Sequence, residues 1–161
     1  MRLLLHVLAL ALTLSQSAYG AEGSASDPTR TAAQTSAEQA NTMKVRITAG
    51  DKAIAATLID NETARDFVTL LPLALTMNDL FGREKFGHLP RAISDGGERA
   101  RTYEVGDMVY WSPGPDVAIF YRHDLQSIPS PGIIVIGKID FGVEALNVSG
   151  SVKMTIERLD K

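Results

Sequence analysis

The residues best suited to chemistry in this 161-residue sequence are arginines and aromatic side chains in its second half. The block Tyr103–Tyr121 holds the only Trp and three of the four Tyr, arranged around the turn Pro113-Gly114-Pro115. Aromatic rings give a pocket apolar walls, and a guanidinium offers several N–H donors. We therefore expect a ligand pocket whose binding residues are Arg83, Phe86, Trp111, Tyr121 and Arg122.

The aromatic candidates also have a plainer role in the core of the fold. Successive side chains of a strand point to opposite faces, so Tyr110 and Trp111 face opposite ways, as do Phe120 and Tyr121. One member of each pair must be core, and we assign that role to Phe120. Trp111 and Tyr121 each have a polar end, which suits the rim of a pocket.

The sequence lacks the residues or motifs that several common kinds of active site require. The sequence has no Cys, which excludes disulfides, thiolate nucleophiles and cysteine-based zinc sites. It has no Gly-x-Ser-x-Gly elbow, no P-loop and no Gly-x-Gly-x-x-Gly motif. His88 and His123 are too few for a zinc site without a carboxylate such as Asp124. We expect no metal and no cofactor, and the residues identify no catalytic group.

Composition indicates one ordinary globular domain that avoids polyanions. Hydrophobic residues make up 45% of the chain and charged residues 22%. The net charge is −3 and no basic block offsets it, so we expect neither nucleic acid nor an anionic membrane as a partner. The sequence does not indicate an oligomeric state.

The first forty residues predict export. Arg2 precedes the apolar run Leu3–Leu14, and Ala18-Tyr19-Gly20 places small residues before a cleavage point, so we interpret residues 1–20 as a signal peptide cleaved after Gly20. Residues 21–41 are rich in Ala, Ser, Thr and Gln and are expected to be a flexible linker. The folded domain is expected at residues 42–161, in the periplasm or secreted, with no stable membrane anchor after cleavage.

The pattern of apolar residues predicts a mostly-β domain. Met43–Ile47 and Ala53–Leu58 should form a hairpin, and further strands are expected at Leu73–Met77, Met108–Trp111, Val117–Tyr121, Ile133–Ile139 and Ser151–Glu157. The uninterrupted run from Ile133 indicates a strand buried on both faces. With weaker candidates this makes seven or eight strands, which favours a barrel.

The sequence predicts one α-helix, between Asp60 and Pro72. Asp60 or Asn61 can cap its start, and Ala64, Phe67, Val68 and Leu71 recur at the spacing of one apolar helix face. Pro72 should end it, and the helix should cover one opening of the barrel.

Two stretches are expected to be loops. Residues 82–102 mix Gly and Pro with four Arg and one Lys, so we expect long surface loops with room for one short strand; a binding role and a merely solvated role remain equally open. Ser127–Gly132 contains two Pro and is expected to form a rigid loop beside the pocket.

The order of these elements resembles the small bacterial cyclophilin-like domains. The resemblance covers roughly residues 43–158 and is most specific in Leu80–Lys85 and Gly106–Tyr121. It implies a small closed β-barrel of about eight strands with one capping helix. Most members of that family have no established activity.

True cyclophilins are peptidyl-prolyl isomerases, which the resemblance raises as an alternative function. The barrier to isomerisation, about 20 kcal/mol, comes from amide resonance, so an Arg aimed at the prolyl nitrogen beside an apolar pocket suffices as catalyst. The sequence lacks the Phe-His-Arg-x-Ile-Pro strand of true cyclophilins, so no catalytic residue carries over by motif.

Three functional hypotheses follow: a module that binds a peptide or small molecule, a prolyl isomerase, and a structural or assembly protein without a ligand. An Arg held over an apolar floor favours the first two, and an Arg free in solvent favours the third. Arg83 and Arg122 are the residues whose exposure decides. If Arg122 belongs to the pocket, Arg122→Ala should weaken binding and leave the melting temperature within a few degrees.

Overall fold

The computed structural model describes residues 43–159, which form nine strands, one α-helix and one 3-10 helix. The expected signal peptide and the expected linker, residues 1–41, lie outside the described residues. The strands are β1 (Met43–Ala49), β2 (Lys52–Leu58), β3 (Leu73–Leu80), β4 (Glu84–His88), β5 (Arg99–Ala100), β6 (Asp107–Trp111), β7 (Asp116–Phe120), β8 (Ile133–Phe141) and β9 (Val152–Arg158). The helices are α2 (Glu62–Val68) and the 3-10 helix η1 (Val143–Leu146).

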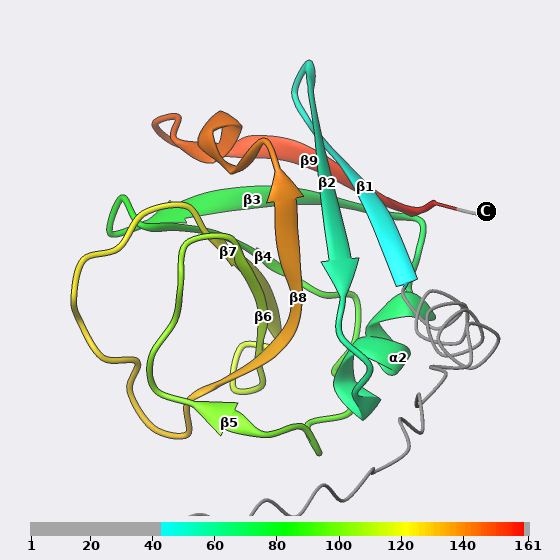
Figure 1. The fold of residues 1–161 in the computed structure, drawn as a ribbon, viewed down its shortest axis with the longest axis vertical. Coiled ribbons are helices and arrows are strands. Elements are labelled where there is room, and N and C mark those ends of the chain that lie inside the picture. Colours follow the sequence, from blue (N-terminus) through cyan, green and yellow to red (C-terminus); the bar gives the residue numbers. More distant parts are fainter. Residues whose placement is uncertain (1–42, 160–161) are drawn as a thin grey trace, which may run out of the picture.

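Eight antiparallel strands close into a barrel, as expected. Their order is β2-β1-β9-β3-β4-β7-β6-β8, and β8 pairs back onto β2 (Figure 1). The ninth strand, β5, pairs with the start of β8. Closure leaves none of the eight barrel strands as an open edge.

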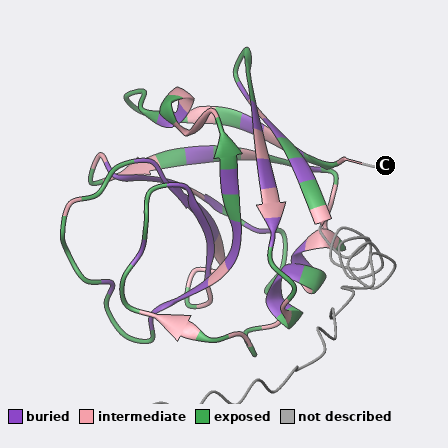
Figure 2. Cartoon of the chain, in the orientation of Figure 1, coloured by how far each residue is buried: buried purple, intermediate pink, exposed green. Residues whose placement is uncertain are grey.

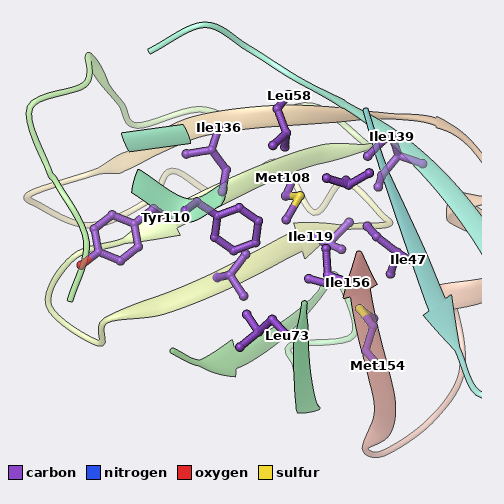
Figure 3. Packing of buried hydrophobic residues seen from close by; sticks show 14 of the residues in the cluster. Ile47, Leu58, Leu73, Met108, Tyr110, Ile119, Ile136, Ile139, Met154 and Ile156 are labelled. Carbon is purple, nitrogen blue, oxygen red and sulfur yellow. The ribbon is translucent and has the colours of Figure 1, made fainter. Parts of the chain in front are cut away.

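The barrel interior is filled by aliphatic side chains that alternate along each strand. Ile47 of β1 faces Ile54 on one neighbouring strand and Ile156 on the other, and all three are buried. Met108 and Ile119 fill the interior from the opposite wall (Figure 3).

A second apolar cluster lies on the outer face of the barrel. Val109 and Ala118 point outward from β6 and β7 and are buried, together with Phe120. They are covered by Tyr103 and Ile128 from the loops before β6 and before β8. Figure 2 shows buried residues in succession along these strands, because both of their faces are covered.

Asn61, one of the two predicted caps, is the N-cap of helix α2. The Asn61 side chain accepts a hydrogen bond from Ala64 N at 2.7 Å and donates one to Val135 O at 2.9 Å, so it fixes the helix to β8. Ala64 and Phe67 are fully buried in the barrel core. The helix ends at Val68, four residues before Pro72, and lies below the ends of β1 and β2 in Figure 1.

The expectation of surface loops across residues 82–102 is wrong for its first part. Glu84–His88 is the barrel strand β4, paired with β3 and β7, and Lys85 on it is fully buried. The charged residues made this stretch resemble a surface loop, but Lys85 points into the barrel and donates hydrogen bonds to Asp79 and Gly150 there. Only Arg99–Ala100 in the rest of this region forms a strand.

Candidate binding pocket

The described residues contain a pocket of about 250 Å³ on the outer face of the barrel. Its floor is made of outward-facing side chains from four strands: Phe86, Val109, Ala118 and Ile133. Ile128 and Pro129, from the loop before β8, form one wall. The proline-containing loop therefore lies beside the pocket, as expected from the sequence.

Hydrogen bonds hold that wall in place. Ile128 N donates to Arg101 O at 2.8 Å, and Arg101 Nε donates to Ile128 O at 3.0 Å. The Ile128 side chain is buried in the outer apolar cluster. A wall fixed by both backbone and packing can keep a pocket open without a ligand.

The turn between β3 and β4 contributes Leu80, Phe81, Arg83 and Glu84 to the pocket. Arg83 N donates to Leu80 O at 3.1 Å, and the central residues Phe81 and Gly82 have φ of 56° and 62°. Left-handed φ at both central positions is the geometry of a type I′ turn, which brings two strands round sharply. The turn places Arg83 directly beside the first residue of β4.

Arg83 is a buried arginine held from several sides. Its side chain is 7% exposed; Nη1 lies 3.0 Å from Asp124 Oδ2, and Nε and Nη2 each lie 3.3 Å from Glu84 Oε1. The guanidinium carbon lies 5.2 Å, 5.5 Å and 5.8 Å from the ring centres of Phe81, Tyr103 and Phe120. Such distances are within cation–π range.

Asp124 pairs with Arg83, and Tyr103 in turn holds Asp124 by hydrogen bonds. Tyr103 Oη donates to Asp124 Oδ1 and accepts from Asp124 N at 3.0 Å, and its ring stacks on Phe120 at 3.8 Å. The hydrogen bond from Tyr103, followed by bonds from Gln126 N and Arg83, lowers the pKa of Asp124 to about 2. Asp124 is therefore an anion at neutral pH and fixes the Arg83 cation.

Glu84 is the buried acid of the pocket. Its side chain is 8% exposed, and burial raises the pKa of its carboxyl group, against the opposing effect of Arg83. Trp111 and Asp116, paired across the end of the β6–β7 hairpin, complete the lining. The result is an apolar, ring-lined pocket with one arginine and two carboxyl groups in its walls.

The sequence model of the cyclophilin-like family matches residues 47–157. This chain belongs to the cyclophilin-like family. The resemblance seen in the sequence is thereby confirmed, and the pocket lies within the matched region.

A solved structure supports the same assignment of fold. The solution structure of a hypothetical protein, AF2241 from Archaeoglobus fulgidus, is similar with a TM-score of 0.60 and 25% identity, over 73% of this chain and 95% of that one. No curated protein matches the sequence. The comparisons place the chain among cyclophilin-like proteins and assign it no activity.

Three of the five predicted pocket residues of this cyclophilin-like domain lie together. Arg83, Phe86 and Trp111 line the pocket. Tyr121 is buried on the inner side, where its Oη donates to Asp79 Oδ2 at 2.6 Å, and burial raises its pKa to about 12. Arg122 is exposed and lies against the turn glycine: a Cβ at Gly82 would be 2.6 Å from its Nη2. Neither lines the pocket.

Sequence reasoning missed Glu84 as a pocket residue and left Phe81 out of the five expected binding residues. Glu84 shares a strand face with Phe86, two residues later, so recognising β4 as a strand would have placed both in the same wall. Phe81 precedes a glycine in a tight turn, and that position gives no sequence signal of a pocket.

The two histidines of the described residues, His88 and His123, do not form a metal site. His88 Nδ1 is 3.2 Å from Asp116 Oδ1, and His123 Nδ1 accepts a hydrogen bond from Leu125 N at 2.9 Å. Across residues 43–159, no group of three His, Cys, Asp or Glu side chains could hold a metal ion. Over the same range, no helix is long and apolar enough to cross a membrane.

Proposed function

We propose that this cyclophilin-like domain binds a peptide or small molecule in the pocket outside β4, β7 and β6. The observation that carries the proposal is the combination of a ring-lined apolar pocket with a buried, fixed Arg83 in its wall. Arginine is rarely buried unless it is paired, and Arg83, paired with Glu84 and Asp124 and held over aromatic rings beside an open pocket, is suited to ligand recognition.

The volume of the pocket limits the size of the ligand that it can bind. Drug-sized ligands occupy about 300 to 1,000 Å³, and this pocket offers about 250 Å³. It therefore suits one ring, or one side chain of a longer peptide whose remainder lies across the surface.

A prolyl isomerase is the second candidate, and Arg83 is the observation that favours it. The guanidinium makes three hydrogen bonds with Glu84 and Asp124 and has further N–H groups to offer. An N–H directed at a prolyl nitrogen would weaken amide conjugation while the apolar floor holds the ring.

An NMR titration of the domain with an Ala-Pro-Phe peptide, combined with exchange spectroscopy, tests both candidates. Amide shifts at Val109, Trp111 and Ile128 report binding in the pocket. Cis–trans exchange much faster than the uncatalysed tens to hundreds of seconds reports isomerisation. Shifts without faster exchange support a binding module alone.

A matched pair of variants locates the binding. Phe86→Ala removes a ring from the pocket floor and should abolish the shifts. Phe141→Ala removes an exposed ring at the end of β8, outside the lining, and should leave them unchanged. Equal titrations of the two variants would rule out the pocket as the binding site.

We also propose that the domain works after export, in the periplasm or outside the cell. Arg2, the apolar run Leu3–Leu14 and Ala18-Tyr19-Gly20 support this proposal. Mass spectrometry of the protein made by an export-competent bacterium should find Ala21 as the first residue. An intact Met1 in the purified protein would contradict it.

A further inference from the structure

Resting on the binding function proposed above, we propose that the pocket selects a ligand with an apolar body and a positively charged amine, and that Glu84 binds that amine. The inference specifies the chemical class of ligand, which the family assignment leaves open. It rests on the charges in and beside the pocket walls, on the hydrogen bonds of Glu84 and on the aromatic rings that line the same pocket.

The charge of Arg83 is already compensated within the protein. Glu84 and Asp124 both contact its guanidinium, at 3.3 Å and 3.0 Å. Asp116 adds a further carboxylate to the lining, and its ion-pair partner is His88, whose side chain is 66% exposed. One buried cation is thus set against the two carboxyl groups of the lining and against Asp124 outside it, so the pocket opposes an anionic ligand and favours a cation.

Glu84 has an oxygen available for a ligand. Its Oε1 lies near both Arg83 nitrogens, and within residues 43–159 no hydrogen bond reaches its Oε2. More than nine-tenths of the side chain is buried, and it lines the pocket. Glu84 Oε2 is not one of the buried side-chain atoms without a partner, so it is open to the pocket, and an ammonium N–H would supply a charge-assisted bond there.

Three aromatic rings surround the same space. Phe81, Phe86 and Trp111 all line the pocket. Ammonium groups are attracted to the faces of such rings, and cages of rings beside a carboxylate are suited to amines. The rings support the same ligand class as the carboxyl groups do, through a different interaction.

The remaining charges near Glu84 do not reverse this preference. Arg101, whose Nε bonds the pocket loop, and Arg122, beside Gly82, are both exposed, so water and salt screen them. Lys85 follows Glu84 in sequence but points to the opposite face, where Asp79 pairs with it at 2.8 Å. His88 carries a positive charge only when protonated, and it lies outside the lining.

A set of three ligands of nearly equal size tests the inference. Phenethylamine, phenethyl alcohol and phenylacetate share a ring and differ in charge, and each is titrated at pH 7 and constant ionic strength against the indole N–H signal of Trp111. We expect phenethylamine to bind at least tenfold more tightly than phenylacetate, with the alcohol between them.

Variants identify the residue responsible. In Glu84→Gln the amine should bind no more tightly than the alcohol, because the amide keeps the shape and loses the charge. Glu157→Gln makes the same change at an exposed position of β9, outside the pocket lining, and should retain the wild-type preference.

The outcomes separate this inference from the binding function. Equal affinities for amine and phenylacetate, or an unchanged amine affinity in Glu84→Gln, would overturn the inference while leaving the pocket a binding site. If none of the three ligands moves the Trp111 signal, both the inference and small-molecule binding in this pocket fail.

Discussion

Phe81 holds a backbone conformation that its residue type disfavours. Its φ of 56° lies in the left-handed region, where glycine and asparagine are usual, and its ring is 74% exposed. The ring is nevertheless part of the pocket lining and lies over Arg83. Strain retained on an exposed apolar side chain is typical of a residue kept for binding rather than for stability.

The strain at Phe81 can be measured by comparing two variants. Both Phe81→Ala and Phe81→Gly remove the ring, but only Gly adopts positive φ freely, so we expect Phe81→Gly to be more stable than Phe81→Ala by about 1 kcal/mol. Urea denaturation measures the difference. At Phe141, in an extended strand, the order should be reversed. Equal stabilities of the two Phe81 variants would mean that the turn carries no strain.

Arg83 should matter for stability as well as for binding. Replacing it with Met leaves Glu84 and Asp124 without their cation, and removing one partner of a buried ion pair costs about 3 kcal/mol. We expect Arg83→Met to lower the free energy of unfolding by that amount, measured by chemical denaturation. Adding Glu84→Gln to this variant should restore part of the loss. A loss well under about 1 kcal/mol would show that solvent screens these pairs.

The pocket residues that could be predicted are those whose type alone suggests binding. Arg83, Phe86 and Trp111 were recognised as a cation and two rings near a turn. The side on which Tyr121 falls depends on the register of β7 and on the buried acceptor Asp79, which no short-range pattern reveals. Glu84 was missed because a carboxylate in a charged stretch resembles solvated surface until its strand is known.

Among the elements, Lys85 joins the turn before β4 to the loop between η1 and β9. Its Nζ donates to Asp79 Oδ2 at 2.8 Å, to Gly150 O at 2.7 Å and to Val148 O, and the side chain is fully buried. Gly82 N and Tyr121 Oη also donate to Asp79, so one carboxylate joins β3, the β3–β4 turn and the end of β7. These bonds use the three N–H groups of the Lys85 ammonium.

Lys85→Met tests this connection. The change leaves Asp79 partly buried without a cation and two carbonyl groups without a donor, so we expect unfolding to become easier by about 3 kcal/mol. Thermal and urea denaturation both measure it. Lys85→Met combined with Asp79→Asn should lose less than the sum of the single changes, because the two residues act as a pair. Additive losses would indicate that they act independently.

The elements predicted correctly are those with an unambiguous apolar pattern. Strands β6, β7 and β8 were predicted because each has a run of apolar residues, as a strand buried on both faces needs. Asn61 was predicted as a helix cap because its side chain can accept a hydrogen bond from the first turn. Strand β4 was hidden because Glu84 is buried against Arg83, which is itself bonded to the distant Asp124, and because Lys85 is buried with Gly150 as a distant partner. Local sequence cannot show that a charge will be paired inside a fold.

In the whole molecule, two apolar layers share one sheet wall. Strands β6 and β7 bury one face in the barrel core and the other under the loops that build the pocket. The pocket floor is therefore part of a wall that is packed on both faces. This arrangement fixes the position of the ligand groups by the packing of the barrel itself.

Paired aspartates should make the whole domain sensitive to acid. A hydrogen bond from Arg91 is the main reason that the pKa of Asp66 falls from the ordinary value of 3.8 to about 2. A hydrogen bond from Tyr103 is the main reason that the pKa of Asp124 falls by the same amount. A carboxyl group whose pKa is depressed in the folded state stabilises it above the unfolded pKa and loses that contribution as the pH falls through both values. The pKa of Glu84 is raised, so its contribution has the opposite sign and declines as the pH rises.

We therefore expect the free energy of unfolding to fall as the pH is lowered from about 4 to 2, because the depressed aspartates take up protons on unfolding in this window. Urea denaturation at stepwise pH measures the slope. Asp66→Asn and Asp124→Asn should each be less stable at pH 7 and show a shallower decline. Asp51→Asn, at a carboxylate 84% exposed on the β1–β2 turn, should keep the wild-type slope. A slope unchanged in both Asp66→Asn and Asp124→Asn would mean that other groups carry the acid sensitivity, and that the bonds from Arg91 and Tyr103 contribute little to holding the fold.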